Sequence, residues 1–508
     1  MAAAYLARAG RRVIVLERRP VPGGAVATEE IVPGFRASTG ADVCGLLRPE
    51  IMEDLDLCTR GVQFLPIDPE VLTLGGSFRL RIWRDVGKTQ SELATKSPRD
   101  AEAYPRFVAL LRRFAAAIEP LLTMTPPNVA NPSLADQMGL LRRALAVRRL
   151  GKDTMQQFLR VPPMPVRDFL NEWFETDLLK ASLAVDALLG TFQGPWSPGT
   201  AFGLIHHSLA QAQGPGWAFV RGGMGTLAGI LAQAAIEAGA TIRTNAEVGR
   251  IVTASGRVTG VELTTGELIG SRAVASNADP KRTFLHLVDP KELSPEFVLR
   301  VRNIEMNGIV AKVNLALGGP LPVPAVANGP APHLRIAPSL EYIEKAYDDA
   351  KYGAVSRAPI ADIFIPTAAD PSLAPPGMHI LSVTVQYAPY SLRDRDWTKE
   401  RDSLAERVIG LLEEYMPGLR SRILGKTVLT PRDIEERFGM TEGHIYHGEM
   451  TLDQTLVLRP VAGWAQYRTP IEGLYLCGAG AHPGGGVTGA PGYNAAREIL
   501  ADWGRLAS

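Results

Sequence analysis

Cysteine is scarce in this 508-residue chain, which holds only Cys44, Cys58 and Cys477 and no C-x-x-C pair. This spacing argues against a disulfide framework, a cysteine zinc site and a redox-active dithiol. Long apolar runs are also lacking, because none reaches the roughly 18 residues that span a bilayer. No secretory signal opens the chain. We therefore expect a protein of the cytoplasm or an organelle matrix, with buried thiols.

The chain also lacks a marked excess of positive or negative charge. Lys and Arg number 54 against 53 Asp and Glu, for a net charge of +1, so nothing favours a nucleic-acid partner. His444 and His447 have the i, i+3 spacing of metal ligands, but no set of acids or cysteines completes a site, so we predict no metal. The length, with 46% hydrophobic residues, suits two or three globular domains.

Glycine is abundant, and it is concentrated near the C-terminal end. The apolar run Leu474 to Cys477 stops at Gly478, glycines recur as far as Gly492, and a helical pattern resumes after Pro491. This order predicts a strand, a glycine-rich turn and a helix. Such a turn brings the backbone close to a bulky ligand and offers unpaired N–H groups to an anion such as a dinucleotide. A tight structural loop is the alternative.

The segment GLYLCGAGAHPGGGVTGAPGYNAA resembles the C-terminal flavin motif of the phytoene desaturase and carotenoid isomerase-like FAD oxidoreductases, within the amine oxidase superfamily. The resemblance implies that FAD is the cofactor. It also implies which residues of the turn lie along the pyrophosphate and ribityl chain, namely Gly478, Ala479 and Gly480, and which face the flavin ring, namely Gly485, Gly486, Val487 and Thr488.

The fold implied by this resemblance is of the mixed α/β (α+β) class, with a Rossmann-like FAD-binding domain of the glutathione-reductase and amine-oxidase type and an inserted substrate domain. We expect residues 1–60, 215–290 and 460–508 to form the discontinuous FAD-binding domain. Residues 61–214 and 291–459 are expected to form the substrate-binding domain with a helical insertion. In the second part, runs at Val310–Leu317, Ala361–Ile365 and His379–Tyr387 alternate apolar and polar residues in part, which predicts a half-buried sheet.

The N-terminal segment contains part of a Rossmann unit. Met1 to Ala9 predicts a helix, and RRVIVLE predicts a buried parallel strand that ends in the acid Glu17. A full unit begins with a strand and a G-x-G-x-x-G loop, and neither is found here. We therefore expect about a dozen or more residues of the family's N-terminal segment to be missing from this sequence, through a fragment or a mis-assigned start.

The remaining candidate cofactor residues follow from the same resemblance. Glu17 is placed to accept hydrogen bonds from the adenosine ribose, with Arg18 beside it; a solvated acid at a strand end is the alternative. Ala25 stands where many family members carry an arginine, so it approaches the cofactor without a phosphate contact. Asn277 lies where a strand reaches the dinucleotide, and a turn-forming role is equally open. The same set includes Gly23, Gly24, Ser38, Thr39 and Val248, the last of which lies at the adenine.

Two histidines are candidate catalytic residues. His482 directly precedes the PGGG turn, where it would tune the flavin or move a proton; a hydrogen bond that stabilises the loop is the alternative. His207 and its neighbour His206 lie in Phe169–Gln211, which predicts two long helical runs. Adjacent helical residues point about 100° apart, so the pair suits no shared metal. One of them, taken as His207, would line the substrate cavity; a packing role is the alternative.

A basic amphipathic helix is predicted over 140–152, in the segment LLRRALAVRRLGK. It would rest on an anionic membrane while the protein takes up an apolar substrate, unless it is simply a helix with one solvated face. The sequence contains no signal of oligomeric state.

Flavin accepts a hydride from the substrate, and the protein orients the two molecules and supplies the electrostatic environment. Apolar segments with scattered Phe, Trp and Met suit a greasy substrate tunnel. The sequence therefore predicts an FAD-dependent oxidoreductase that desaturates or isomerises an apolar, polyene or lipid-like substrate. Two alternatives stay open. One is an amine oxidase-like flavoenzyme. The other is an interaction or regulatory protein that keeps the fold without flavin, and the missing glycine loop supports it.

Overall fold

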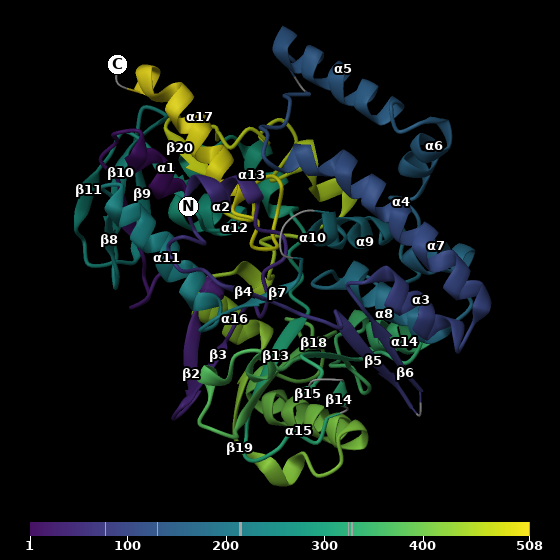
Figure 1. Cartoon of the computed structure of the whole chain (residues 1–508). Helices are drawn as coiled ribbons and strands as arrows, with labels where there is room; N and C mark the ends of the chain where they lie inside the picture. The colour runs from purple at the N-terminus through teal and green to yellow at the C-terminus, as the bar shows by residue number, and fades with distance from the viewer. Residues whose placement is uncertain (77, 130, 213–215, 324, 327–328, 507–508) are drawn as a thin grey trace.

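Two parallel strand pairs lie at the upper left of Figure 1, beside the N-terminus. The computed structural model describes residues 1–508 except 77, 130, 213–215, 324, 327–328 and 507–508. In the first pair β1 (Ile14–Leu16) runs parallel to β8 (Thr241–Arg243), and in the second β12 (Val274–Ser276) runs parallel to β20 (Leu474–Leu476). Each pair forms a separate two-stranded sheet. The strands predicted before Glu17 and Gly478 are therefore present.

Beside these strand pairs, the first and last helices of the chain pack against each other. Leu6 of α1 (Ala2–Arg8) is buried in one cluster with Ile499 of α17 (Ala490–Leu506). The prediction of a buried β1 is wrong, because Ile14 is 38% exposed and the other two residues are half-buried. Among the described strands β1 pairs with β8 alone, and its residues line the cavity described below. The further elements here are α11 (Met224–Glu237), β9 (Val248–Ala254), β10 (Arg257–Leu263) and β11 (Leu268–Gly270).

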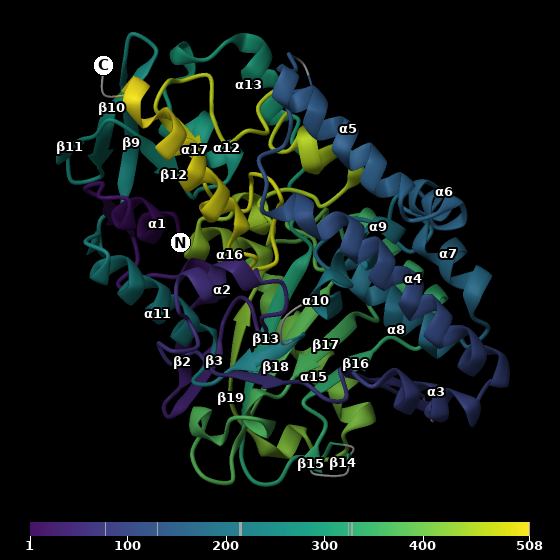
Figure 2. The same cartoon turned by 45° about the horizontal axis from the view of Figure 1, so that its top comes forward.

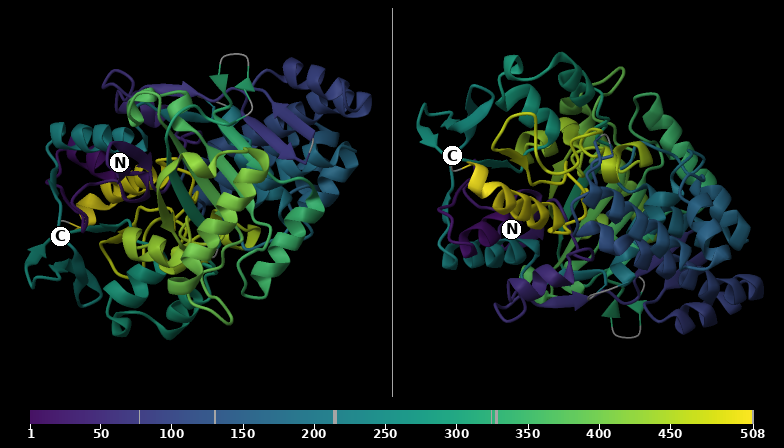
Figure 3. Two further views of the ribbon diagram at one scale, coloured as in Figure 1. Left: turned by 90° about the horizontal axis from the view of Figure 1, so that it is seen from below. Right: turned by 90° about the horizontal axis from the view of Figure 1, so that it is seen from above.

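A seven-stranded sheet forms the lower part of Figure 1, in the order β19-β13-β18-β17-β16-β5-β6. It combines strands from both segments assigned to the substrate domain, and only β5 and β16 pair in parallel. Helix α15 (Trp397–Tyr415) packs on this sheet, as the view from below in Figure 3 shows. The strands are β5 (Val71–Gly75), β6 (Phe78–Ile82), β13 (Val310–Leu317), β16 (His333–Ile336), β17 (Ile360–Phe364), β18 (His379–Gln386) and β19 (Ile423–Leu429).

The prediction of a half-buried sheet is wrong for the central strands. Every residue of β13 and β17 is buried. The polar side chains in these strands meet buried polar partners instead of water: Lys312 reaches Asp42, and the side chain of Asn314 lies 2.7 Å from the hydroxyl oxygen of Ser382. In β13, the polar residues that alternate with apolar ones in the sequence therefore face buried polar side chains and not solvent.

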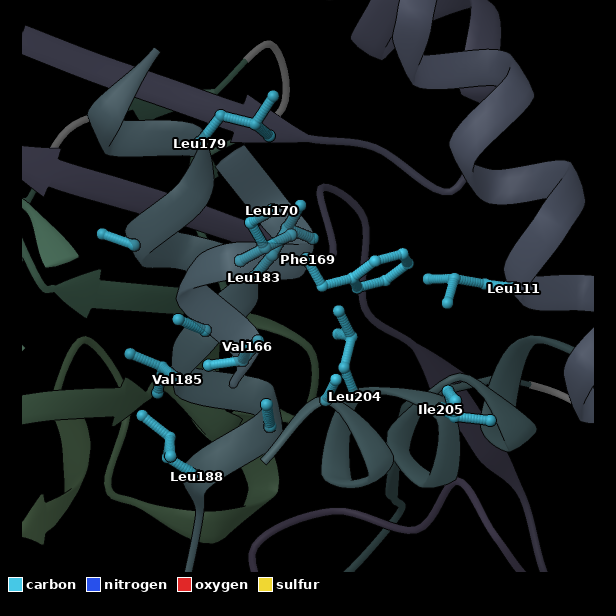
Figure 4. Packing of buried hydrophobic residues seen from close by; sticks show 14 of the residues in the cluster. Leu111, Val166, Phe169, Leu170, Leu179, Leu183, Val185, Leu188, Leu204 and Ile205 are labelled. Atoms are coloured by element: carbon cyan, nitrogen blue, oxygen red, sulfur yellow. The ribbon is translucent and has the colours of Figure 1, made fainter. Parts of the chain in front are cut away.

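A layer of helices packs beside this sheet, at the upper right of Figure 1. Leu183 of α8 lies beside Leu170 of α7 in the core shown in Figure 4, which also contains Leu179 and Leu188 of α8. The two runs predicted over Phe169–Gln211 are four helices. The chain leaves helical geometry at Phe174 and at Leu189, and Ser208 separates the last two helices. The helices are α3 (Val86–Ala94), α4 (Pro98–Leu122), α5 (Leu134–Arg148), α6 (Lys152–Arg160), α7 (Val166–Trp173), α8 (Asp177–Leu188), α9 (Ala201–His207) and α10 (Leu209–Ala212).

The helix predicted over 140–152 begins earlier and ends earlier. It is α5, which starts at a capping box between Ser133 and Asp136 and ends before Gly151, whose φ of +88° interrupts the helical geometry. In the described part of the chain, no helix is long and apolar enough to cross a membrane. Other elements are α2 (Pro49–Asp54), β2 (Thr28–Val32), β3 (Phe35–Ser38), β4 (Phe64–Pro66), β7 (Ala218–Val220), α12 (Pro280–Arg282), α13 (Pro295–Arg302), β14 (Ala325–Val326), β15 (Gly329–Pro330), α14 (Leu340–Lys351) and α16 (Pro431–Phe438).

Candidate cofactor and active site

One large cavity connects the parallel strand pairs with the seven-stranded sheet and the helical layer. Its volume is about 1700 Å³, and its lining includes residues of β1, β12, β13 and α9. Pockets for single drug-sized ligands usually enclose about 300–1,000 Å³. The cavity is therefore large enough for a dinucleotide together with a second molecule.

The ends of three parallel strands meet this cavity. Glu17 follows β1, Asn277 follows β12 and Gly478 follows β20 shortly after its end, and all three residues line the cavity. Carboxyl ends of parallel strands are where open α/β sheets bind ligands. One oxygen of Glu17, Oε1, accepts a hydrogen bond from the backbone N–H of Arg19 at 2.9 Å. This bond orients the carboxylate at the strand end.

Backbone segments approach one another closely along the cavity wall. A Cβ at Gly40 would lie 2.3 Å from the carbonyl oxygen of Ala25, and one at Gly478 would lie 2.5 Å from that of Asn277. Gly24 has a φ of +54°, and a Cβ there would meet nothing within 4 Å. Glycine is thus required for the close approach at Gly40 and Gly478, while Gly24 turns bare backbone toward open space.

The structure brings most predicted cofactor residues together. Ser38 and Gly480 lie outside the lining: Ser38 accepts a hydrogen bond from the N–H of Met224 at 3.0 Å, and Gly480 packs against Pro280. The predicted residues that line the cavity are Glu17, Arg18, Gly23, Gly24, Ala25, Thr39, Val248, Asn277, Gly478, Ala479, Gly485, Gly486, Val487 and Thr488.

Helix α9 presents both of its histidines to the cavity, where the sequence predicted one. His206 approaches the glycine turn, because its Cε1 lies 3.9 Å from the position of a Cβ at Gly486. Burial lowers the pKa of His206 to about 4. The ring of His207 stacks on Trp217 with centroids 4.6 Å apart, and its Nε2 lies 3.5 Å from Oδ1 of Asp186. Burial lowers the pKa of His207 although Asp186 opposes the shift.

Behind His207 lies a buried ion network that sequence reasoning missed. Arg335 of β16 contacts Asp362 of β17 with Nε at 2.9 Å and Asp186 of α8 with a terminal nitrogen at 2.7 Å. The ring of His333 lies 2.7 Å from Asp362 through Nε2. Burial alone would raise the pKa of Asp362, but Arg335 and His333 hold it well below its usual range. Asp362 is therefore charged, and the buried guanidinium of Arg335 contacts both carboxyl groups.

A second buried pair lies on another part of the wall. Lys312 of β13 forms an ion pair with Asp42, and Thr384 of β18 lies 3.3 Å from the Lys312 nitrogen. Ser382 donates a hydrogen bond to the other oxygen of Asp42 at 2.6 Å. The side chains of Lys312 and Asp42 are 3% and 7% exposed, so the pair is fixed in the protein interior.

His482 does not line the cavity. It is buried at 2% exposure, its Nε2 lies 2.7 Å from the carbonyl oxygen of Leu121, and its own carbonyl accepts a hydrogen bond from Tyr467 at 2.9 Å. These contacts tie the turn to α4 and favour the loop-stabilising alternative over the catalytic one.

His482 also predicts an acid-dependent loss of stability. Burial lowers its pKa to about 4, whereas an unfolded histidine titrates near 6.5. Above pH 6.5 neither state binds the proton; as the pH falls toward 4 only the unfolded state binds it, so stability is lost. We expect His482 to account for about 3 kcal/mol of the loss.

The measurement is urea unfolding of the chain and of His482→Gln at pH 7 and pH 5. The variant should lose less stability between the two pH values than the unchanged chain. An equal loss in both proteins would contradict the assignment.

Residues 1–500 match the protein family described as flavin containing amine oxidoreductase. The chain belongs to this family. It is 38% identical to pyridine nucleotide-disulfide oxidoreductase domain-containing protein 2 of Rattus norvegicus over 99% of this chain and 91% of that protein. It is 27% identical to the lycopene-forming phytoene desaturase of Pseudescherichia vulneris, over 95% and 93% of the two chains.

The fold is also found among solved structures. Cyclohexylamine oxidase from Brevibacterium oxydans superposes with a TM-score of 0.61 over 100% of this chain and 97% of its own, at 16% identity. As a flavin containing amine oxidoreductase, the protein is an oxidoreductase with FAD as cofactor.

The residues present fit FAD. A carboxylate ends strand β1, and the close backbone approaches at Gly40 and Gly478 leave no room for side chains between these segments. The cavity volume exceeds what a single small ligand needs. The strand-end carboxylate is one of the features by which this type of fold binds a dinucleotide.

Proposed function

We propose that the protein desaturates or isomerises an apolar, polyene or lipid-like substrate, bound in the part of the cavity next to α9. One observation carries the choice of substrate class. Among the described residues, the three aspartates that line the cavity, Asp42, Asp186 and Asp362, each contact a buried Lys or Arg. A substrate ammonium would compete with cations that are already in place, whereas an uncharged substrate disturbs no ion pair.

The proposed cofactor contacts use the chain's own residues. The free oxygen of Glu17 would accept a hydrogen bond from the ribose, and the bare backbone at Gly23 and Gly24 would lie along the phosphates. The turn Gly485 to Thr488 would lie against the ring. FAD, when bound, supplies the acceptor for a hydride from carbon.

His207 is the proposed proton acceptor. Its Nε2 faces Asp186, and a proton held there leaves Nδ1 with a lone pair. Burial keeps the ring neutral at pH 7 by lowering its pKa. The side chain is 23% exposed, and it lines the cavity. A neutral imidazole with a carboxylate behind it can take the second hydrogen of a C–C desaturation as a proton.

Amine oxidation is the second candidate, because the family name and cyclohexylamine oxidase both point to amines. An amine site needs a free carboxylate or an aromatic cage. The pairing of the three carboxylates favours the hydrocarbon substrate.

The test is reduction of bound flavin without oxygen. The purified chain is supplied with FAD, freed of unbound cofactor, and mixed with an isoprenoid polyene in detergent micelles or with a primary alkylamine. We expect the polyene to bleach the visible flavin absorption and the amine to leave it unchanged; detergent alone is the control. Bleaching by the amine alone would overturn the proposed substrate class, and a folded protein that binds no FAD would overturn the function as a whole.

A further inference from the structure

Helix α5 stands outside the packed part of the molecule. In Figures 1 and 2 it lies at the edge of the helical layer, apart from both sheets. None of its described residues is buried. Exposed apolar patches on a protein surface mark sites of contact with a partner or a membrane.

Four apolar residues of α5 form one stripe, which we call the α5 stripe: Leu134, Met138, Leu141 and Leu145. Their side chains are 79%, 56%, 61% and 44% exposed. Spacings of four, three and four residues place them on one face of a helix. Leu140, which is 42% exposed, lies about 120° away from this stripe around the helix. Four large apolar side chains in a row thus face solvent.

Basic residues flank the α5 stripe. At about 100° per residue, Arg142 and Arg149 fall on one side of the stripe and Arg148 on the other. In the part of the chain that the structure describes, none of the three forms an ion pair with a carboxylate, and Asp136, used in the cap, is the one acid of α5. The stripe is therefore bordered by uncompensated positive charge.

We propose that α5 docks in the surface of an anionic lipid bilayer, with the α5 stripe among the acyl chains and the flanking arginines at the headgroups. Exposed leucines bordered by arginines are the pattern of helices that lie in this interface. Arginine also has a long stem that reaches headgroups while apolar neighbours insert. A protein partner would have to supply a groove with acidic rims. The contact is peripheral and involves no spanning segment.

The experiment uses the full chain with sedimented vesicles, either of phosphatidylcholine alone or with about one third phosphatidylglycerol. We expect binding to the anionic vesicles, weakening with salt. The triple variant Arg142→Gln/Arg148→Gln/Arg149→Gln should bind about 100-fold more weakly, since each basic residue near such a surface contributes about fivefold. Its matched control, with the same charge change on exposed sites elsewhere, is Arg36→Gln/Arg79→Gln/Arg302→Gln.

The stripe is tested by Met138→Ser/Leu141→Ser, which should bind at least about tenfold more weakly. Its control is Leu268→Ser/Leu299→Ser, at two positions that are 67% and 58% exposed. All these sites are on the surface, and circular dichroism verifies that the variants fold. The proposal is overturned if the chain ignores anionic vesicles at low salt, if stripe and control variants behave alike, or if α5 variants dissociate a dimer without changing vesicle binding.

Discussion

Replacing Arg335 with methionine is expected to lower the free energy of unfolding by about 3–5 kcal/mol. Arg335 is 2% exposed and reaches both Asp186 and Asp362. Without it, two carboxyl groups remain in the interior. Among the described residues, the ring of His333 still contacts Asp362, and Asp186 faces the neutral ring of His207. Urea unfolding monitored by fluorescence measures the loss.

A second variant separates charge from packing. In Arg335→Met/Asp186→Asn/Asp362→Asn the carboxylates are neutral, so much of the lost stability should return. Exposed Arg302→Gln is the control and should change stability by less than about 0.5 kcal/mol. Equal stability of Arg335→Met and the unchanged chain would contradict the ion network.

Replacing His207 with alanine is expected to slow reduction of the bound flavin by substrate about 10²- to 10⁴-fold, the usual contribution of a general base. Rapid-mixing absorption without oxygen measures the rate constant. Since His207 lies on α9 and is proposed to act on the substrate, the visible spectrum of the bound flavin should stay the same.

Two further variants distinguish a proton acceptor from a packing residue. Asp186→Asn should change the pH dependence of the rate constant, because Asp186 faces Nε2 of His207. His286→Asn, at an exposed position that does not line the cavity, should behave like the unchanged chain. A His207→Ala protein with an unaltered rate constant would remove His207 from the mechanism.

The cofactor side of the cavity was largely predictable from sequence because its signals are local. The turn after β20 carries its glycines within one short segment, and Glu17 directly follows its strand. In both cases the local geometry follows from residues next to each other in the sequence: glycines in the turn, and an acid at the end of a strand. The structure then placed most of these residues around one cavity.

The substrate side could not be predicted in the same way. Asp186 and Arg335 lie 149 positions apart, and they meet only because α8 packs beside β16. The distance between these two residues along the sequence gives no indication that their side chains are in contact. The same limit explains the errors for β1 and β13: periodicity tells how side chains alternate, but not whether a cavity or a buried partner lies across from them.

The pairing of β5 with β16 constrains the order in which the molecule can be built on the ribosome. Thr73 lies opposite Arg335, so the partner edge of β5 leaves the ribosome about 260 residues later. At about 5–20 residues per second, this delay is about 10–50 s. Until then the β5–β6 hairpin presents an unpaired edge that carries Leu72 and Leu74, both buried in the finished protein. During synthesis this hairpin is therefore open to aggregation, because unpaired apolar strand edges aggregate.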